Sequence, residues 1–62
     1  MKLLYELQKG SKIYCKVSDG SKYVIFDHID GAYSYCETEN GSPIHISAVA
    51  PLKKFKDGYK II

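Results

Sequence analysis

Two aspartates and two histidines are the side chains best suited to acid–base chemistry. Asp27 and Asp30 lie three residues apart, and His28 and His45 are candidate general bases. Neither histidine has an adjacent serine or cysteine nucleophile, and no glycine-rich phosphate loop occurs. An aspartate in a turn more often bonds to its own backbone than takes part in catalysis. The sequence therefore predicts a protein that is not an enzyme and has no catalytic residues.

Aromatic side chains offer binding chemistry instead. Tyr33 and Tyr35 are two residues apart, so on a strand they share one face. Such a pair can form a stacking platform like those of proteins that bind single-stranded nucleic acid. The commoner alternatives are that both rings belong to the core of a barrel or to a subunit interface.

All nine basic residues are lysines, and they are confined to the two flanks of the chain. Residues 23–52 contain none and carry four acidic side chains, although the whole chain has a net charge of +2. If the flanks meet in the fold, they form a basic face typical of a polyanion binder. The simpler alternative is a set of solvated lysines on strand edges. Because arginine is absent, any contact with nucleic acid should be loose and sensitive to salt.

The two cysteines, Cys15 and Cys36, lack the paired spacing and the neighbouring histidines of a structural zinc site. We expect no metal and no other cofactor. A disulfide would need neighbouring strands, and because no signal peptide is evident, the sequence favours reduced and buried thiols. No apolar run approaches the roughly 20 residues needed to cross a bilayer. The sequence predicts a cytoplasmic protein with neither a membrane partner nor a small-molecule substrate.

The elements that must position these residues are short. A single domain over residues 1–62 is expected, and a chain of this size buries only about 60% of its unfolded surface. Self-association is a usual supplement to so small a core. Leucines at positions 3, 4 and 7 predict an amphipathic helix over residues 1–9, ended by Gly10.

After Gly10 the hydrophobic period changes to two, which indicates strands. The expected strands span residues 11–18, 21–28, 32–36, 44–49 and 59–62, and residues 52–57 are expected to be a connection. The turns between strands are expected at Asp19–Gly20, Asp30–Gly31, Asn40–Gly41 and Asp57–Gly58. Five short strands at regular spacing predict an all-β fold, either a small barrel or a sandwich.

Three motifs resemble those of the Sm-like superfamily, which includes the LSm proteins and the bacterial RNA chaperone Hfq. Phe26-Asp27 followed by Ile29 resembles the F-D-x-F that closes strand two of the family. Residues 46–51, I-S-A-V-A-P, resemble its I-S-T-V-V-P after strand four, and Asp19–Gly20 takes the place of its first turn. The resemblance implies a five-stranded, strongly bent antiparallel barrel of SH3-like shape over residues 11–62, preceded by the short helix. Compact members also occur in viruses of bacteria, which would place the protein in the host cytoplasm.

The resemblance also implies an assembly and a ligand. Sm-like subunits form homo-oligomeric rings by pairing strand four of one subunit with strand five of the next. The implied interface residues in this chain are Ile44, Ile46, Tyr59 and Ile61. RNA or another single-stranded nucleic acid would bind weakly through the loop between strands two and three. The residues of this loop are Asp27, His28, Ile29, Asp30 and Gly31.

Other residues depart from the family. Ile29 stands where relatives usually carry an aromatic or histidine side chain that stacks on a base. The basic residue at the end of strand four is missing, and His45 is displaced by one position. Two alternatives therefore stay open. The first concerns assembly: Ile61 and Ile62 would close the barrel of the monomer itself. The second concerns function: the chain would be an SH3-like protein-interaction or structural module with no nucleic-acid role.

Overall fold

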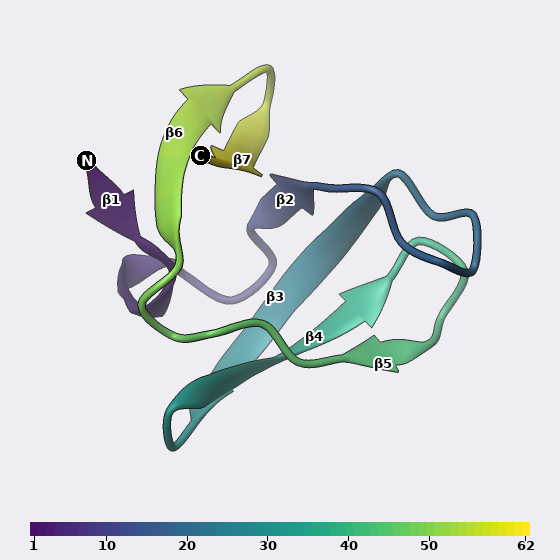
Figure 1. Ribbon diagram of the computed structural model, residues 1–62, viewed down its shortest axis with the longest axis horizontal. Coiled ribbons are helices and arrows are strands. Elements are labelled where there is room, and N and C mark those ends of the chain that lie inside the picture. The colour runs from purple at the N-terminus through teal and green to yellow at the C-terminus, as the bar shows by residue number, and fades with distance from the viewer.

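The computed structural model describes residues 1–62 as a single curved β-sheet with one short 3-10 helix (Figure 1). The elements are β1 (Lys2–Leu3), η1 (Leu4–Glu6), β2 (Lys12–Tyr14), β3 (Tyr23–Asp30), β4 (Tyr33–Thr38), β5 (Pro43–Ile44), β6 (Pro51–Phe55) and β7 (Gly58–Ile61). Seven strands are hydrogen-bonded in the order β1-β6-β7-β2-β3-β4-β5. The pair β2–β7 is parallel and the other pairs are antiparallel.

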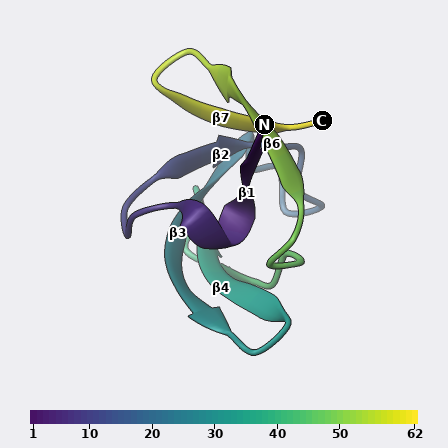
Figure 2. The same cartoon turned by 90° about the vertical axis from the view of Figure 1, so that its left-hand side faces the viewer.

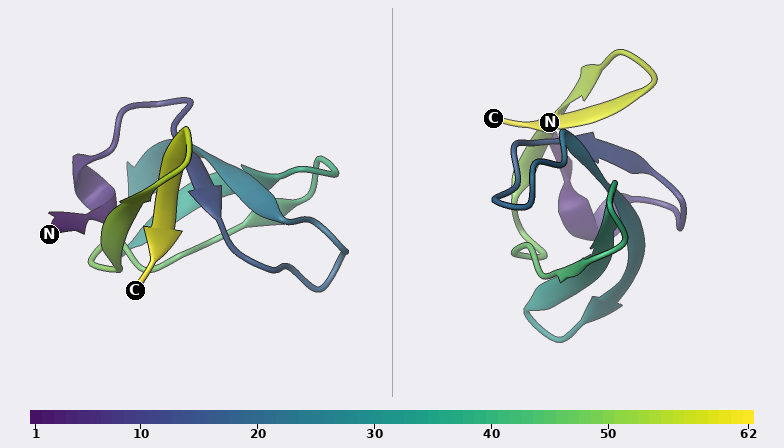
Figure 3. Two further views of the ribbon diagram at one scale, coloured as in Figure 1. Left: turned by 90° about the horizontal axis from the view of Figure 1, so that it is seen from above. Right: turned by 90° about the vertical axis from the view of Figure 1, so that its right-hand side faces the viewer.

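The prediction of a small β-rich fold is confirmed, but the closed five-stranded antiparallel barrel is wrong. The sheet is open and mixed, and β1 and β5 are its two free edges. The sheet bends strongly. The β6–β7 hairpin and the tip of the β3–β4 hairpin lie at opposite ends of the molecule (Figures 2 and 3).

The predicted helix over residues 1–9 is also wrong. The chain forms the two-residue β1 and then the three-residue η1. The backbone N–H groups of Leu4 and Tyr5 donate to the carbonyls of Ala50 and Ala48, at 3.0 and 2.9 Å. These bonds, together with the pairing of β1 with β6, attach the segment to the residues before and within β6 in place of the predicted helix. Leu4 is fully buried, so the predicted burial of this leucine is achieved without a helix.

The middle and last predicted strands agree with β3, β4 and β7 to within a few residues. The strand predicted over residues 44–49 is reduced to β5 and an isolated bridge between Tyr33 and Ser47. The predicted connection over residues 52–57 is largely the strand β6, in which Leu52 is buried and pairs with Ile61. The sequence did not predict this strand, because the lysines after Leu52 point to solvent and give no alternation of apolar and polar residues.

The last turn is shifted by one residue from the predicted Asp57–Gly58. Lys56 takes the left-handed conformation, with φ of 50°, and Gly58 begins β7. Gly58 is instead required for a close approach, because a Cβ atom there would lie 2.4 Å from the carbonyl oxygen of Lys12. The absence of a side chain at Gly58 thus allows β7 to lie beside β2.

A bulge at Asp27 decides which side chains of β3 face outward. Phe26 pairs with Cys36 and His28 pairs with Tyr35, so Asp27 is an extra residue in the ladder. In a regular strand without the bulge, His28 would lie two residues after Phe26 and share its buried face. The bulge turns His28 outward.

The core takes one face of β3 and of β4. Along β4 the buried and exposed side chains alternate strictly, with Ser34 and Cys36 inside and Tyr33 and Tyr35 outside. Both cysteines are free, and burial raises the pKa of each thiol. The buried apolar cluster consists of Leu4, Leu7, Ile13, Val24, Phe26, Cys36, Ala50 and Leu52.

Asp19 ties the loop before β3 to the turn after β4. Its carboxylate accepts bonds from the backbone N–H of Ser21 and from the hydroxyl of Thr38, both at 2.8 Å. Its backbone carbonyl accepts a bond from the side-chain amide of Asn40 at 3.0 Å. The bonds from Ser21, and then from Thr38, lower the pKa of the Asp19 carboxyl.

A carboxyl whose pKa is lowered by folding contributes stability above its unfolded pKa of about 4, and this contribution disappears as the pH falls through the folded value. We expect Asp19→Asn to destabilise the protein at neutral pH and to approach the wild type in stability in acid. Urea unfolding followed by circular dichroism at several pH values would measure this convergence. A difference between the two proteins that stays constant with pH would contradict the role given to the ionised carboxylate.

Candidate nucleic-acid interface

The two basic flanks of the chain meet in the structure. β2 and β7 lie side by side, with Tyr14 opposite Lys60, and β6 lies beyond β7 (Figure 1). The absence of a side chain at Gly58, which lies close to the Lys12 backbone, permits this arrangement. We name the resulting surface the lysine–aromatic face. It consists of Lys12, Tyr14, Lys16, Lys22, Tyr23, Phe55, Lys56, Asp57 and Lys60.

Tyr14 is at the centre of the aromatic part of this face. Its ring meets the rings of Phe55 and Tyr23 edge-on, with centroids 5.2 and 6.2 Å apart. Lysine ammonium groups lie over these rings: Lys12 Nζ is 4.5 Å from the centroid of Tyr23, and Lys60 Nζ is 5.1 Å from that of Phe55. Cation–π attraction and the alkyl stems of the lysines hold charge close to apolar surface.

An open pocket of about 320 Å³ lies in the lysine–aromatic face. Its apolar lining comes from the rings of Tyr14 and Phe55 and from Cys15. Lys16, Lys22 and Lys60 also line it, but nearly all of the exposed lining is apolar, so these lysines contribute mainly their alkyl stems. Such a pocket suits a flat aromatic group, because Tyr14 and Phe55 offer rings on which it can stack.

The lysine–aromatic face also contains a carboxylate of its own. Asp57, in the β6–β7 turn, accepts a short hydrogen bond from the Tyr14 hydroxyl and a 3.4 Å bond from Lys12 Nζ. The hydroxyl of Tyr14, and then Lys12, lower the pKa of Asp57, while the carboxylate raises the pKa of both partners. Asp57 is therefore ionised at neutral pH.

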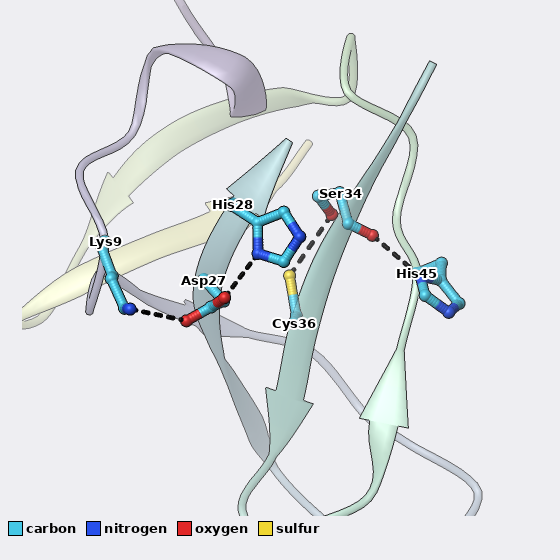
Figure 4. A network of polar contacts seen from close by, with 6 residues as sticks. All are labelled: Lys9, Asp27, His28, Ser34, Cys36 and His45. Atoms are coloured by element: carbon cyan, nitrogen blue, oxygen red, sulfur yellow. Dashed lines mark hydrogen bonds and ion pairs between the residues drawn. The ribbon is translucent and has the colours of Figure 1, made fainter. Parts of the chain in front are cut away.

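The loop that the sequence predicted to bind nucleic acid lies elsewhere, around the tip of the β3–β4 hairpin. His28 Nδ1 lies 2.5 Å from one carboxylate oxygen of Asp27, and Lys9 Nζ lies 3.3 Å from the other (Figure 4). The bond from His28, and then Lys9, lower the pKa of Asp27. The remaining predicted residues, Ile29, Asp30 and Gly31, are all exposed beside it. The predicted residues thus lie close together, but two of them, Asp27 and Asp30, are carboxylates that would repel phosphate.

Three aromatic rings form a row outside this hairpin. The rings of His28 and Tyr35 are stacked, with centroids 5.4 Å apart and planes 9° apart. The ring of His45 meets that of Tyr35 edge-on, with centroids 5.4 Å apart. Nδ1 of His45 lies 3.1 Å from the carbonyl oxygen of Ser34 (Figure 4). The interpretation of Tyr33 and Tyr35 as core residues is wrong, because β4 buries Ser34 and Cys36 instead.

The residues predicted to join subunits are used within the chain. Ile44, Ile46, Tyr59 and Ile61 are half-buried and pack against the core. β7 is paired with β6 on one side and with β2 on the other, so it has no free edge for a second subunit. In the alternative prediction, Ile61 and Ile62 close the barrel of the monomer. β7 is indeed paired within the chain, but the sheet that it joins is open and not a closed barrel.

No protein-family model matches the chain, and no curated protein or solved structure shows significant similarity to it. The Sm-like resemblance stays a prediction. No helix has the length and apolar character needed to cross a membrane. No three histidine, cysteine or acidic side chains are grouped so that they could hold a metal ion.

The sequence did not single out the rings of Tyr14, Tyr23 and Phe55 as a site. Their positions lie far apart along the chain, and the pairing of β2 with β3 and β7 brings them together. The one signal available was the confinement of lysines to the two flanks, which is the observation that predicted a basic face.

Proposed function

We propose that this protein is a non-enzymatic module that binds single-stranded nucleic acid through the lysine–aromatic face. The observation that carries the proposal is the pocket in which Tyr14 and Phe55 are bordered by Lys16, Lys22 and Lys60. Proteins that bind single strands combine aromatic rings, on which bases stack, with basic side chains that follow the phosphates. The face supplies both kinds of group on the same surface.

The charge of the face supports the same conclusion. Five lysines and one aspartate belong to it, while the net charge of the whole chain is only +2. Positive charge is therefore concentrated on β2, β7, the β6–β7 turn and the loop after β2. Ammonium groups on flexible stems bind phosphates as point charges without reading bases, so binding should tolerate different sequences.

A second candidate function is an SH3-like module that binds a basic protein segment. A pocket of about 270 Å³ beside the β3–β4 hairpin supports it. Ile25, Phe26 and Tyr35 give this pocket an apolar lining, and Asp27 and Glu37 give it negative charge. Lys9 already pairs with Asp27 there, which reduces the charge available to a partner.

Titration of fluorescent oligo-U and oligo-A at low and moderate salt tests the proposed function. We expect both to bind with similar affinities, and log K to fall linearly with log[salt] by about 0.7 for each phosphate contact. Absence of binding at low salt would overturn the proposal and leave the protein-interaction module. Strong binding that does not change with salt would also contradict it, because lysine–phosphate contacts release counterions.

A further inference from the structure

We propose that Asp57 occupies a phosphate subsite in the free protein, and that a phosphate of the bound strand displaces its carboxylate. The subsite is formed by the Lys12 ammonium group and the Tyr14 hydroxyl. This inference rests on the proposed function and adds to it a named anion position and a built-in competitor. The lysine–aromatic face would thereby limit its own affinity for nucleic acid.

The geometry of the subsite is that of an anion held by two donors. The Tyr14 hydroxyl bonds to Oδ1 of Asp57 and the Lys12 ammonium group bonds to Oδ2. Two oxygens of a phosphate group can accept the same two bonds, since phosphate and carboxylate share this donor requirement. Lys56 adds positive charge nearby, because its ammonium group lies 5.8 Å from the centroid of the Tyr14 ring.

Tyr14 connects the subsite to the pocket. Its ring lines the pocket and its hydroxyl bonds to Asp57. A base stacked in the pocket therefore brings its phosphates close to the hydroxyl and to Lys12. In that complex the Asp57 carboxylate either leaves the subsite or repels the strand.

Asp57 is able to leave. Its side chain is 66% exposed, whereas that of Lys12 is 28% exposed, so the donor is the more firmly placed partner. The carboxylate lies in the β6–β7 turn, and once displaced it would be solvated by water. The pKa of Asp57 is lowered in the free protein, so the competing group stays negatively charged at neutral pH.

Asp57→Asn tests this inference, and Asp30→Asn is its matched control. Both variants raise the net charge by one, but Asp30 lies on β3 and makes no side-chain bond to the lysine–aromatic face. We expect Asp57→Asn to bind oligo-U about fivefold more tightly than the wild type, because a surface ion pair no longer competes with the phosphate. We expect the affinity of Asp30→Asn to rise by less than about twofold over the wild type. Circular dichroism would verify that both variants are folded.

A measurement on the wild-type protein provides a second test. The ¹³C resonance of the Asp57 carboxyl can be followed against pH in the free protein and in the protein saturated with oligo-U. We expect the pKa of Asp57 to rise towards the ordinary carboxyl range on saturation, because the carboxylate loses its bonds from Tyr14 and Lys12.

The outcomes separate this inference from the proposed function. If the wild type binds oligo-U but Asp57→Asn gains no more affinity than Asp30→Asn, Asp57 is not a competitor and the proposed function stands. A pKa of Asp57 that is unchanged on saturation has the same meaning. If the wild type and both variants fail to bind at low salt, the proposed function and this inference are both overturned.

Discussion

Gly58→Ala is expected to disrupt the packing of the β6–β7 hairpin on β2. The added Cβ would lie 2.4 Å from the Lys12 carbonyl oxygen and 3.1 Å from the carbonyl carbon. Both atoms belong to the backbone and cannot rotate away as a side chain would. Overpacking of this kind costs about 1–3 kcal/mol or more, which is a large part of the stability of a domain of this size. Urea unfolding followed by circular dichroism would measure the loss.

Gly31→Asn is the matched control for that variant. Gly31 has φ of 64°, in the left-handed region that asparagine tolerates, and nothing lies within 4 Å of a Cβ atom placed there. We expect a change in unfolding free energy of less than about 1 kcal/mol. If the Gly58 variant were as stable as the Gly31 variant, the tight approach of β7 to β2 would not hold the lysine–aromatic face together.

The combined variant Lys16→Gln, Lys22→Gln and Lys60→Gln is expected to lose most of its affinity for single strands. The three side chains are exposed, so the fold should be retained. Because all three line the pocket, their neutralisation removes the contacts that the proposed function assigns to phosphates. We expect binding of oligo-U at low salt to weaken by about 100-fold and the salt slope to fall by about 2, at roughly 0.7 per contact. Fluorescence anisotropy across a salt series gives both values.

Lys2→Gln, Lys9→Gln and Lys54→Gln together make the control, because they remove the same charge from outside the pocket. Lys2 and Lys54 lie over Tyr59, and Lys9 pairs with Asp27. A loss of about tenfold or less is expected from the change in net charge alone. Equal losses in the two combined variants would mean that binding follows net charge and that the pocket has no special role.

The parts of the fold that the sequence predicted well depend on neighbours along the chain. Asp19–Gly20 and Asn40–Gly41 lie in turns in which the glycine has a positive φ, a conformation that glycine adopts without strain. The turn after β3 is at Gly31–Ala32, one residue later than the predicted Asp30–Gly31. The alternation of Tyr33, Ser34 and Tyr35 indicated a strand, and β4 includes all three. The choice of the outward face for the tyrosines needed the pairing of β4 with β3 and β5.

The errors arose where a distant segment competed with a local preference. Residues 1–9 have the pattern of an amphipathic helix, but the pairing of β1 with β6 and the bonds to the carbonyls of Ala48 and Ala50 hold the segment as β1 and η1 instead. β6 has a weak pattern of its own and is stabilised by pairs such as Leu52 with Ile61. The bulge at Asp27 could not be predicted, because the extra residue is defined only by the register of β3 against β4.

The sequence by itself determined a small β-rich chain, its main turns and two basic flanks separated by an acidic middle, because composition and short-range periodicity carry that information. The tertiary structure alone decided which aromatic and basic side chains lie on one surface. The parallel pairing of β2 with β7 joins residues more than forty positions apart, such as Tyr14 and Lys60. That pairing depends on the missing side chain of Gly58 and on shared burial with the core, and no local pattern specifies it. The lysine–aromatic face is a product of that contact.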